Sequence, residues 1–200
     1  MTGVGTVITP FNGRSREWLL GDFRTCSYFA PPSGGPLSEY PRFVRDDAPD
    51  LHELLQPLAF LVGGWQGRGD GCWAGGFSFR DSMRFSHDGR PLLRYDETTV
   101  GPDGRPSHAE TGFFAIQDNG DVHVTLAEPS GITEVLIGRP EVDRLVLTSV
   151  EIGHTPTTDN VTACRRQLRI EDGSLVAEVE IAVNNEKLTP HTRSVLHRVT

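Results

Sequence analysis

Histidine and cysteine are the side chains of this sequence that most readily bind a metal or act as nucleophiles. There are seven histidines and three cysteines. No His-x-x-x-His pair and no Cys-x-x-Cys pair occurs, which argues against a zinc site and against a disulfide scaffold. A Gly-x-Ser-x-Gly elbow is also missing, so a serine hydrolase is disfavoured. The candidate functional residues of this chain are therefore isolated histidines.

Two of these histidines stand at the starts of strand-like runs. His191 lies in TPHTRSVLHRV, and by itself it is typical of an exposed loop histidine. His197 follows six residues later, so both share a face in a regular strand, and a period of two does not tell which one points inward. His108, beside Glu110 in SHAETGFF, is equally typical of a pocket residue and of an ordinary strand residue.

A glycine-rich stretch, GGWQGRGDG at residues 63–71, raises the question of what approaches its backbone. A dinucleotide-binding loop needs Gly-x-Gly-x-x-Gly at the start of a helix, whereas a strand pattern follows these glycines. No Gly-Lys-Ser/Thr occurs anywhere. The stretch instead predicts the first strand of a barrel, in which glycines permit sharp curvature and Trp65 packs at one end.

From Trp65 onward, apolar residues recur at every second position. Phe77, Phe79, Met83 and Phe85 share one face, and eight further runs of strand length follow. Turn signals separate them: His87-Asp88-Gly89, Pro102-Asp103-Gly104, Asn119-Gly120, Pro129-Ser130-Gly131 and Asp172-Gly173. The pattern predicts an all-β fold, a single antiparallel up-and-down barrel of about ten strands, wide enough to enclose a ligand.

The residues before the barrel differ from it in composition. Residues 1–50 are rich in proline and glycine and predict an irregular extension, which leaves residues 51–200 as the barrel domain. Leu51, Leu54, Leu55 and Leu58 have helical spacing, with Asp50 as a candidate N-cap, and Pro57 limits this helix to a short one.

Charge and hydropathy predict which classes of partner the protein binds and in which compartment it lies. The net charge is -8 and the pI about 5.3, so no nucleic-acid partner is expected. The longest apolar run, LAFLV, is too short to span a membrane, and no secretory signal pattern occurs. The expected localisation is cytoplasmic.

The pattern Gly63-x-Trp65-x-Gly67-x-Gly69, together with FSHDGRPLLRY, SHAETGFF and the terminal PHTRSVLHRV, resembles the nitrobindin family. The resemblance covers about residues 51–200. Its most specific part is the combination of the glycine pattern with a Pro-His close to the end of the chain. Members of this family are small barrels, similar to fatty-acid-binding proteins, that carry ferric haem b.

The resemblance implies one ferric haem b per chain, with His191 as the axial ligand and as a catalytic residue. It implies that His108 lies on the opposite side of the pocket, where it hydrogen-bonds a ligand or controls solvent access. The further cofactor contacts it implies are Gly63, Trp65, Gly67 and Gly69. The chain departs from the family pattern at CWAGGFSF (72–79), at Thr192, where leucine is usual, and at Glu128, where glutamine is common.

The function implied by the resemblance is that of a peroxynitrite isomerase, which converts peroxynitrite to nitrate and binds nitric oxide. The expected partners are these small molecules, and homodimer formation is left open. Two alternatives stand beside this hypothesis. One is a non-enzymatic carrier of a fatty acid or another apolar ligand, and the other is a family member that has lost haem binding.

Overall fold

The computed structural model describes residues 49–72 and 75–199. Almost all of the extension predicted for residues 1–50 lies outside the described residues. No helix in the described part of the chain is long and apolar enough to cross a membrane.

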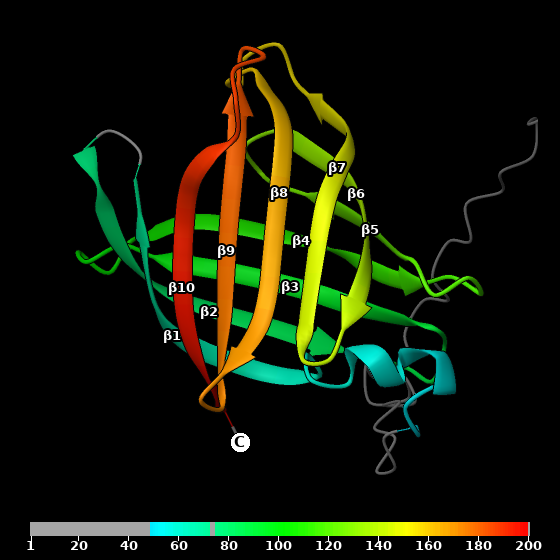
Figure 1. Ribbon diagram of the computed structural model, residues 1–200. Coiled ribbons are helices and arrows are strands. Elements are labelled where there is room, and N and C mark those ends of the chain that lie inside the picture. The colour runs from blue at the N-terminus through cyan, green and yellow to red at the C-terminus, as the bar shows by residue number, and fades with distance from the viewer. Residues whose placement is uncertain (1–48, 73–74, 200) are drawn as a thin grey trace, which may run out of the picture. The chain divides into compact units, whose positions relative to one another are not determined.

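Ten strands account for most of the described residues. They are β1 (Gly63–Gly71), β2 (Phe77–Ser86), β3 (Leu92–Val100), β4 (Pro106–Ile116), β5 (Val122–Ala127), β6 (Ile132–Glu141), β7 (Arg144–His154), β8 (Val161–Glu171), β9 (Ser174–Val183) and β10 (Thr189–Val199). Each strand pairs antiparallel with the next, and β1 pairs with β10, so the sheet closes into a barrel (Figure 1). Closure removes the unpaired sheet edges. The predicted ten-stranded up-and-down barrel is confirmed.

The turns form where the sequence predicts them. Asp172 and Gly173, between β8 and β9, have φ angles of 48° and 78°. Positive φ at both central residues is the geometry of a type I′ hairpin, which Asp-Gly favours. In such a meander, the connections that follow odd-numbered strands lie at one end, here called the mouth. The connections that follow even-numbered strands lie at the other, closed end.

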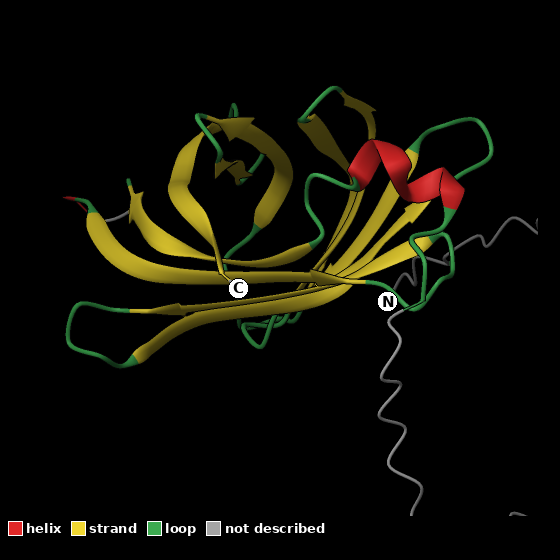
Figure 2. Ribbon diagram, turned by 90° about the horizontal axis from the view of Figure 1, so that it is seen from below, coloured by secondary structure: helices red, strands yellow, loops and turns green. Residues whose placement is uncertain are grey.

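A short 3-10 helix, η2 (Glu53–Leu58), leads into β1 at the closed end, in the foreground of Figure 2. The prediction of Asp50 as its N-cap was wrong. His52 is the N-cap, and its Nδ1 accepts a hydrogen bond from the backbone N–H of Leu54 at 3.2 Å. Imidazole Nδ1 provides the acceptor that a side-chain oxygen of Ser, Thr, Asp or Asn provides in most caps. Leu55 and Leu58, two of the leucines at helical spacing, are fully buried.

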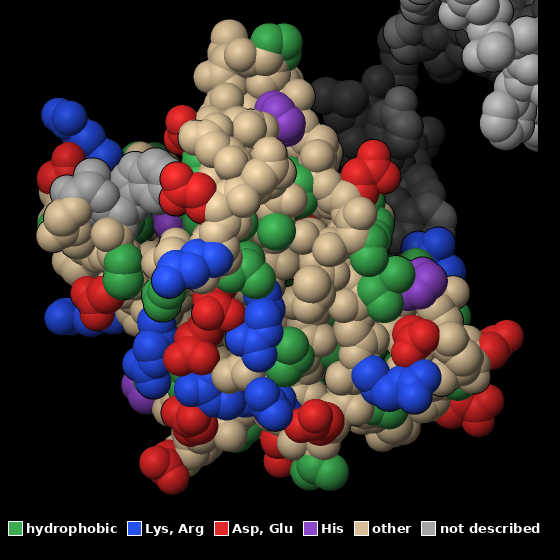
Figure 3. All heavy atoms as spheres, turned by 45° about the horizontal axis from the view of Figure 1, so that its top comes forward, with side chains coloured by type: hydrophobic (Ala, Val, Ile, Leu, Met, Phe, Trp, Pro, Cys, Tyr) green, Lys and Arg blue, Asp and Glu red, His purple; other side chains and the backbone are tan. Residues whose placement is uncertain are grey.

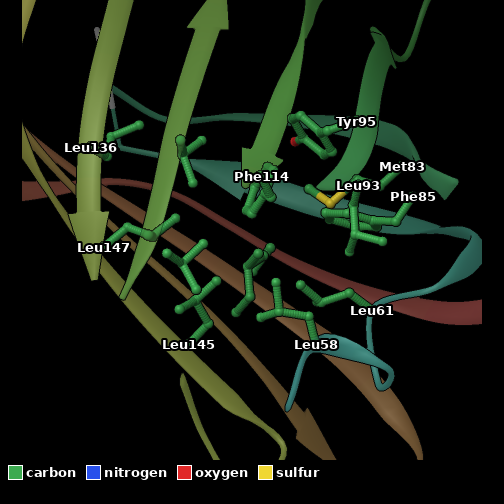
Figure 4. Close-up of a cluster of buried hydrophobic side chains, with 14 of the residues drawn as sticks. Leu58, Leu61, Met83, Phe85, Leu93, Tyr95, Phe114, Leu136, Leu145 and Leu147 are labelled. Carbon is green, nitrogen blue, oxygen red and sulfur yellow. The ribbon is translucent and has the colours of Figure 1, made fainter. Parts of the chain in front are cut away.

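The apolar core fills the closed half of the barrel. Leu58 and Leu61 enter it from the helical segment, while side chains such as Phe85, Phe114 and Leu147 point inward from the strands (Figure 4). Because side chains fill this half, the space for a ligand is left near the mouth.

Three inward-facing glycines bring neighbouring strands close together. A Cβ at Gly67 would lie 2.0 Å from the carbonyl oxygen of Val195, and Gly112 and Gly138 face similar backbone contacts at 1.9 Å. No other residue fits such a position without a shift of the backbone. Gly67 of β1 therefore permits the close approach of β1 and β10, and the predicted role of the β1 glycines in strand curvature stays a prediction.

Candidate functional site

The two candidate histidines meet at the mouth because each opens an even-numbered strand. His108 lies near the start of β4 and His191 near the start of β10. All even-numbered strands begin at the mouth, and β4 and β10 lie in opposite walls of the closed barrel. The topology thus brings together two residues that are far apart in the sequence.

A β-bulge decides which histidine of β10 belongs to the site. The pairing of β10 with β9 shifts between Pro190 and Thr192, so His191 is the extra residue. The bulge breaks the period of two, and the two histidines no longer share a face. His197 is exposed, and its Nδ1 lies 3.1 Å from Ser174 Oγ. His191 is half-buried and lines a pocket at the mouth.

This mouth pocket has a volume of about 470 Å³. Its apolar wall consists of Phe77, Ile132, Val161 and Ile181, which lie in strands β2, β6, β8 and β9. Residues of the β7–β8 loop add polar groups at the rim. A concave apolar surface with a few polar groups is the usual form of a small-molecule or cofactor site.

The pocket keeps His191 uncharged. Burial lowers the pKa of the His191 imidazole, and the nearby positive charges of His108 and Arg166 act in the same direction. A neutral imidazole, unlike an imidazolium, can bind a metal ion through a ring nitrogen. His191 is therefore a competent metal donor at neutral pH.

The environment raises the pKa of His108, whereas it lowers that of His191. Its Nε2 lies 3.7 Å from an oxygen of Glu110, and interaction with this carboxylate raises the pKa of His108 above its ordinary value. The mouth of the barrel thus carries one histidine whose pKa is lowered and one whose pKa is raised.

Glu110 owes its own charge to Arg166. The guanidinium binds both of its oxygens, with NH1 2.7 Å from Oε1 and NH2 2.8 Å from Oε2, and its Nε lies 2.8 Å from Glu134 Oε2. The carboxyl groups of Glu110 and Glu134 are 1% and 4% exposed. Arg166 holds the pKa of Glu110 well below its usual range despite burial.

The sequence pattern did not predict this layer of buried charge. Glu97, Glu110, Glu134 and Arg166 occupy inward positions of strands in which apolar residues alternate with polar ones. The sequence feature that could have predicted them is a charged residue at a strand position where the alternation requires an apolar, inward-facing residue. The opposite charges do not pair within one strand, so only the closed barrel shows that they meet.

The predicted cofactor contacts in β1 lie in different surroundings. Trp65 is 1% exposed and its indole Nε1 donates to the carbonyl oxygen of Leu61 at 2.8 Å, near the closed end. At the mouth end of the strand, the ring of Phe79 lies over Gly69, where a Cβ would be 2.3 Å from it. Contact of Gly63, Trp65, Gly67 and Gly69 with a cofactor stays a prediction.

The chemistry of the available donors favours haem at His191. Cys164 is buried, and burial raises the pKa of its thiol to about 12, so it does not offer a thiolate. His108, Glu110 and Glu128 place donor atoms within 4.8 Å of one another, but Glu110 is already bound by the Arg166 cation. A neutral imidazole beside an apolar wall fits an axially ligated haem.

The outer face of the barrel contrasts with the mouth. Arg165, Arg169 and Arg193 alternate there with glutamates of β8 and β9, and Figure 3 shows the two signs of charge interleaved. These pairs are partly exposed, as is usual for a solvated surface.

Comparison with known proteins identifies the family of the chain. Residues 54–198 match the THAP4-like, heme-binding beta-barrel domain. A protein named peroxynitrite isomerase 2 from Mycobacterium avium (strain 104) is 38% identical over 156 residues, which are 74% of this chain and 97% of that protein. A relative in Arabidopsis thaliana named peroxynitrite isomerase Rv2717c is 31% identical, over 76% of this chain and 93% of that protein.

A solved structure supports the same assignment. The crystal structure of Rv2717c from M. tuberculosis is similar with a TM-score of 0.70 at 36% identity, over 76% of this chain and all of that chain. The shared fold, the level of identity and the matched domain lead to one conclusion: the chain belongs to the family of THAP4-like haem-binding β-barrel proteins, with relatives named peroxynitrite isomerase.

Proposed function

We propose that this protein binds ferric haem b through His191, binds nitric oxide and isomerises peroxynitrite to nitrate. The observation that carries the proposal is a half-buried His191, kept neutral in an apolar pocket at the mouth of the barrel. Relatives at 31–38% identity are named for this activity. When bound, the haem supplies the iron at which peroxynitrite rearranges.

The residues of the chain have separate tasks in this function. His191 would hold the iron, and Phe77, Val161 and Ile181 would provide an apolar wall for the macrocycle. His108 approaches from the opposite wall. As an imidazolium it attracts an anion such as peroxynitrite and donates a hydrogen bond to it. Glu110 keeps this proton on His108.

The alternative of a fatty-acid carrier is less well supported by the interior of the barrel. Below the mouth lie the buried charges of Glu110, Glu134 and Arg166, and the cavity beside them measures about 30 Å³. That volume suits about one water molecule, not an acyl chain. The charged layer also makes burial of an apolar ligand unfavourable.

Titration with hemin tests the proposal. We expect a Soret band at one haem per chain in the wild type, its loss in His191→Ala, and its retention in His197→Ala. His197 is the matched control because it lies on the same strand and is exposed. Absence of a band in the wild type would refute haem binding, and a band unchanged in His191→Ala would refute the ligand assignment.

Activity is tested separately by stopped-flow measurement of peroxynitrite decay. We expect the haem-loaded wild type to accelerate the decay with nitrate as product, and His108→Gln to slow it while its Soret band persists. Haem-loaded protein without acceleration would refute the isomerase function and leave a haem carrier or sensor.

A further inference from the structure

The barrel holds more buried acid than base beneath the mouth pocket. Asp81, Glu110 and Glu134 are 3–4% exposed, and Glu97 lines the 30 Å³ cavity together with Tyr95 and Arg166. In the described part of the chain, the ion pairs of this group involve Arg166 and, at the mouth, His108. Four carboxylates cannot all stay ionised in such surroundings, because desolvation and mutual repulsion both favour protonation.

The Tyr95 hydroxyl shows where one of the protons lies. It is within hydrogen-bond distance of two carboxyl groups, Glu110 Oε1 at 2.8 Å and Glu97 Oε2 in a short contact. A hydroxyl has a single proton and donates only one of these bonds. Since Arg166 grips Glu110 as a carboxylate, Tyr95 donates to Glu110, and Glu97 must be the protonated group that donates to the Tyr95 oxygen.

Asp81 adds a further buried carboxyl to this group, one level nearer the mouth than Glu97. Neither of its carboxyl oxygens has a hydrogen-bond partner that the geometry supports, although its side chain is 3% exposed. Its nearest polar neighbours include Ser194 and Glu97, and burial raises its pKa. A buried, unpaired carboxyl is stable as the neutral acid.

The other end of this hydrogen-bonded chain reaches the mouth. His108 Nε2 lies 3.7 Å from Glu110 Oε2, a separation that one rotation of the imidazole or one bridging water closes. The His108 side chain is 37% exposed, so it is open to solvent at the mouth of the barrel.

We propose that Glu97, Tyr95 and Glu110 form a proton relay to His108, so that the sealed interior of the barrel stores a proton for ligands at the mouth. When His108 gives a ring proton to a bound anion and turns the vacated nitrogen toward Glu110, the Glu97 proton passes to the Tyr95 oxygen and the Tyr95 proton passes to Glu110 Oε1. A bridging water then carries the proton from Oε1 to the vacated nitrogen of His108, and Glu110 is again the carboxylate. The Glu97 O–H bond is the net bond broken, and Glu97 becomes the carboxylate. This inference concerns the barrel's own residues and does not require haem.

Infrared spectroscopy of the haem-free protein tests whether Glu97 holds a proton. We expect the carbonyl stretch of a protonated carboxyl group at neutral pH, reduced in Glu97→Gln and unchanged in the control Glu186→Gln, whose side chain is exposed. Wild-type protein without this band, or a band that Glu97→Gln leaves intact, would overturn the proposal. Hemin plays no part in this measurement, so its outcome is independent of the proposed function.

Hydrogen–deuterium exchange of the same group tests the path. On transfer to D2O, the band shifts as the buried proton exchanges. We expect this exchange to be at least about tenfold slower in Tyr95→Phe and in His108→Gln, because the remaining route is local opening of the barrel. Tyr95→Phe retains the ring that packs on Phe85 and Phe114. His108→Gln tests the path independently should Tyr95→Phe fail to fold.

The control for the path is His123→Gln, which changes an exposed histidine of the adjacent strand β5. Its exchange rate should equal that of the wild type. If either Tyr95→Phe or His108→Gln exchanges as fast as the wild type in a folded protein, that residue is not on the path and the relay is refuted.

Discussion

Replacement of Arg166 by methionine should be among the most damaging single changes in the barrel, although its neighbour Arg165 should tolerate the same change. Arg166 is 12% exposed in its side chain and pairs with Glu110 and Glu134, which are 1% and 4% exposed. Removal of one partner from a buried ion pair costs about 3–5 kcal/mol, because the remaining charge stays buried without compensation.

The neighbouring residue provides the control. Arg165 pairs with Glu180 on the outer face, where the two side chains are 39% and 32% exposed. A solvated pair of this kind contributes about 0–1 kcal/mol. For a domain of this size, 1 kcal/mol corresponds to about 2–4 °C in Tm. Arg166→Met should therefore lower Tm by about 6–20 °C, and Arg165→Met by no more than about 4 °C.

Thermal unfolding followed by circular dichroism, with urea titration for the free energy of unfolding, measures both variants. The Arg166→Met deficit should shrink as the pH falls, since the buried Glu110, without its arginine, then becomes neutral in the folded state. Adding Glu110→Gln and Glu134→Gln to the same chain should restore part of the stability at neutral pH. Equal losses in the two arginine variants, or a deficit that grows in acid, would refute the buried-pair reasoning.

Two further predictions concern the interior. Glu97→Gln should become more stable relative to the wild type as the pH rises. Burial raises the pKa of Glu97 well above its ordinary value, so unfolding releases its proton. Wild-type stability therefore falls by about 1.4 kcal/mol per pH unit up to the folded pKa. A pH-independent difference in urea midpoints would contradict this. Gly67→Ala should cost about 1–3 kcal/mol, because its Cβ would lie 2.0 Å from the Val195 carbonyl oxygen. Gly64→Ala is the milder comparison, since its Cβ meets the end of the Val199 side chain, and equal Tm values for the two variants would show that β1 and β10 separate easily.

The sequence alone determined the architecture of the barrel because its signals are local. A period of two in the strands and turn residues such as Asp172-Gly173 depend on neighbouring residues, and both reappear in the structure. The helix start was mispredicted for a local reason as well. His52 Nδ1 caps the helix as Asp50 was expected to do, and propensity alone ranks aspartate first.

The site depended on contacts that no local pattern contains. A single bulge between Pro190 and Thr192 separates the roles of His191 and His197, and a bulge changes which face a residue occupies without a mark in the spacing. Likewise, Glu110 meets Arg166 across 56 residues only because closure of the barrel brings β4 and β8 within reach through its interior. The sequence determined which elements form and what side chains they carry. Tertiary structure decided which histidine lines the pocket and which buried charges are paired, because both follow from register and closure.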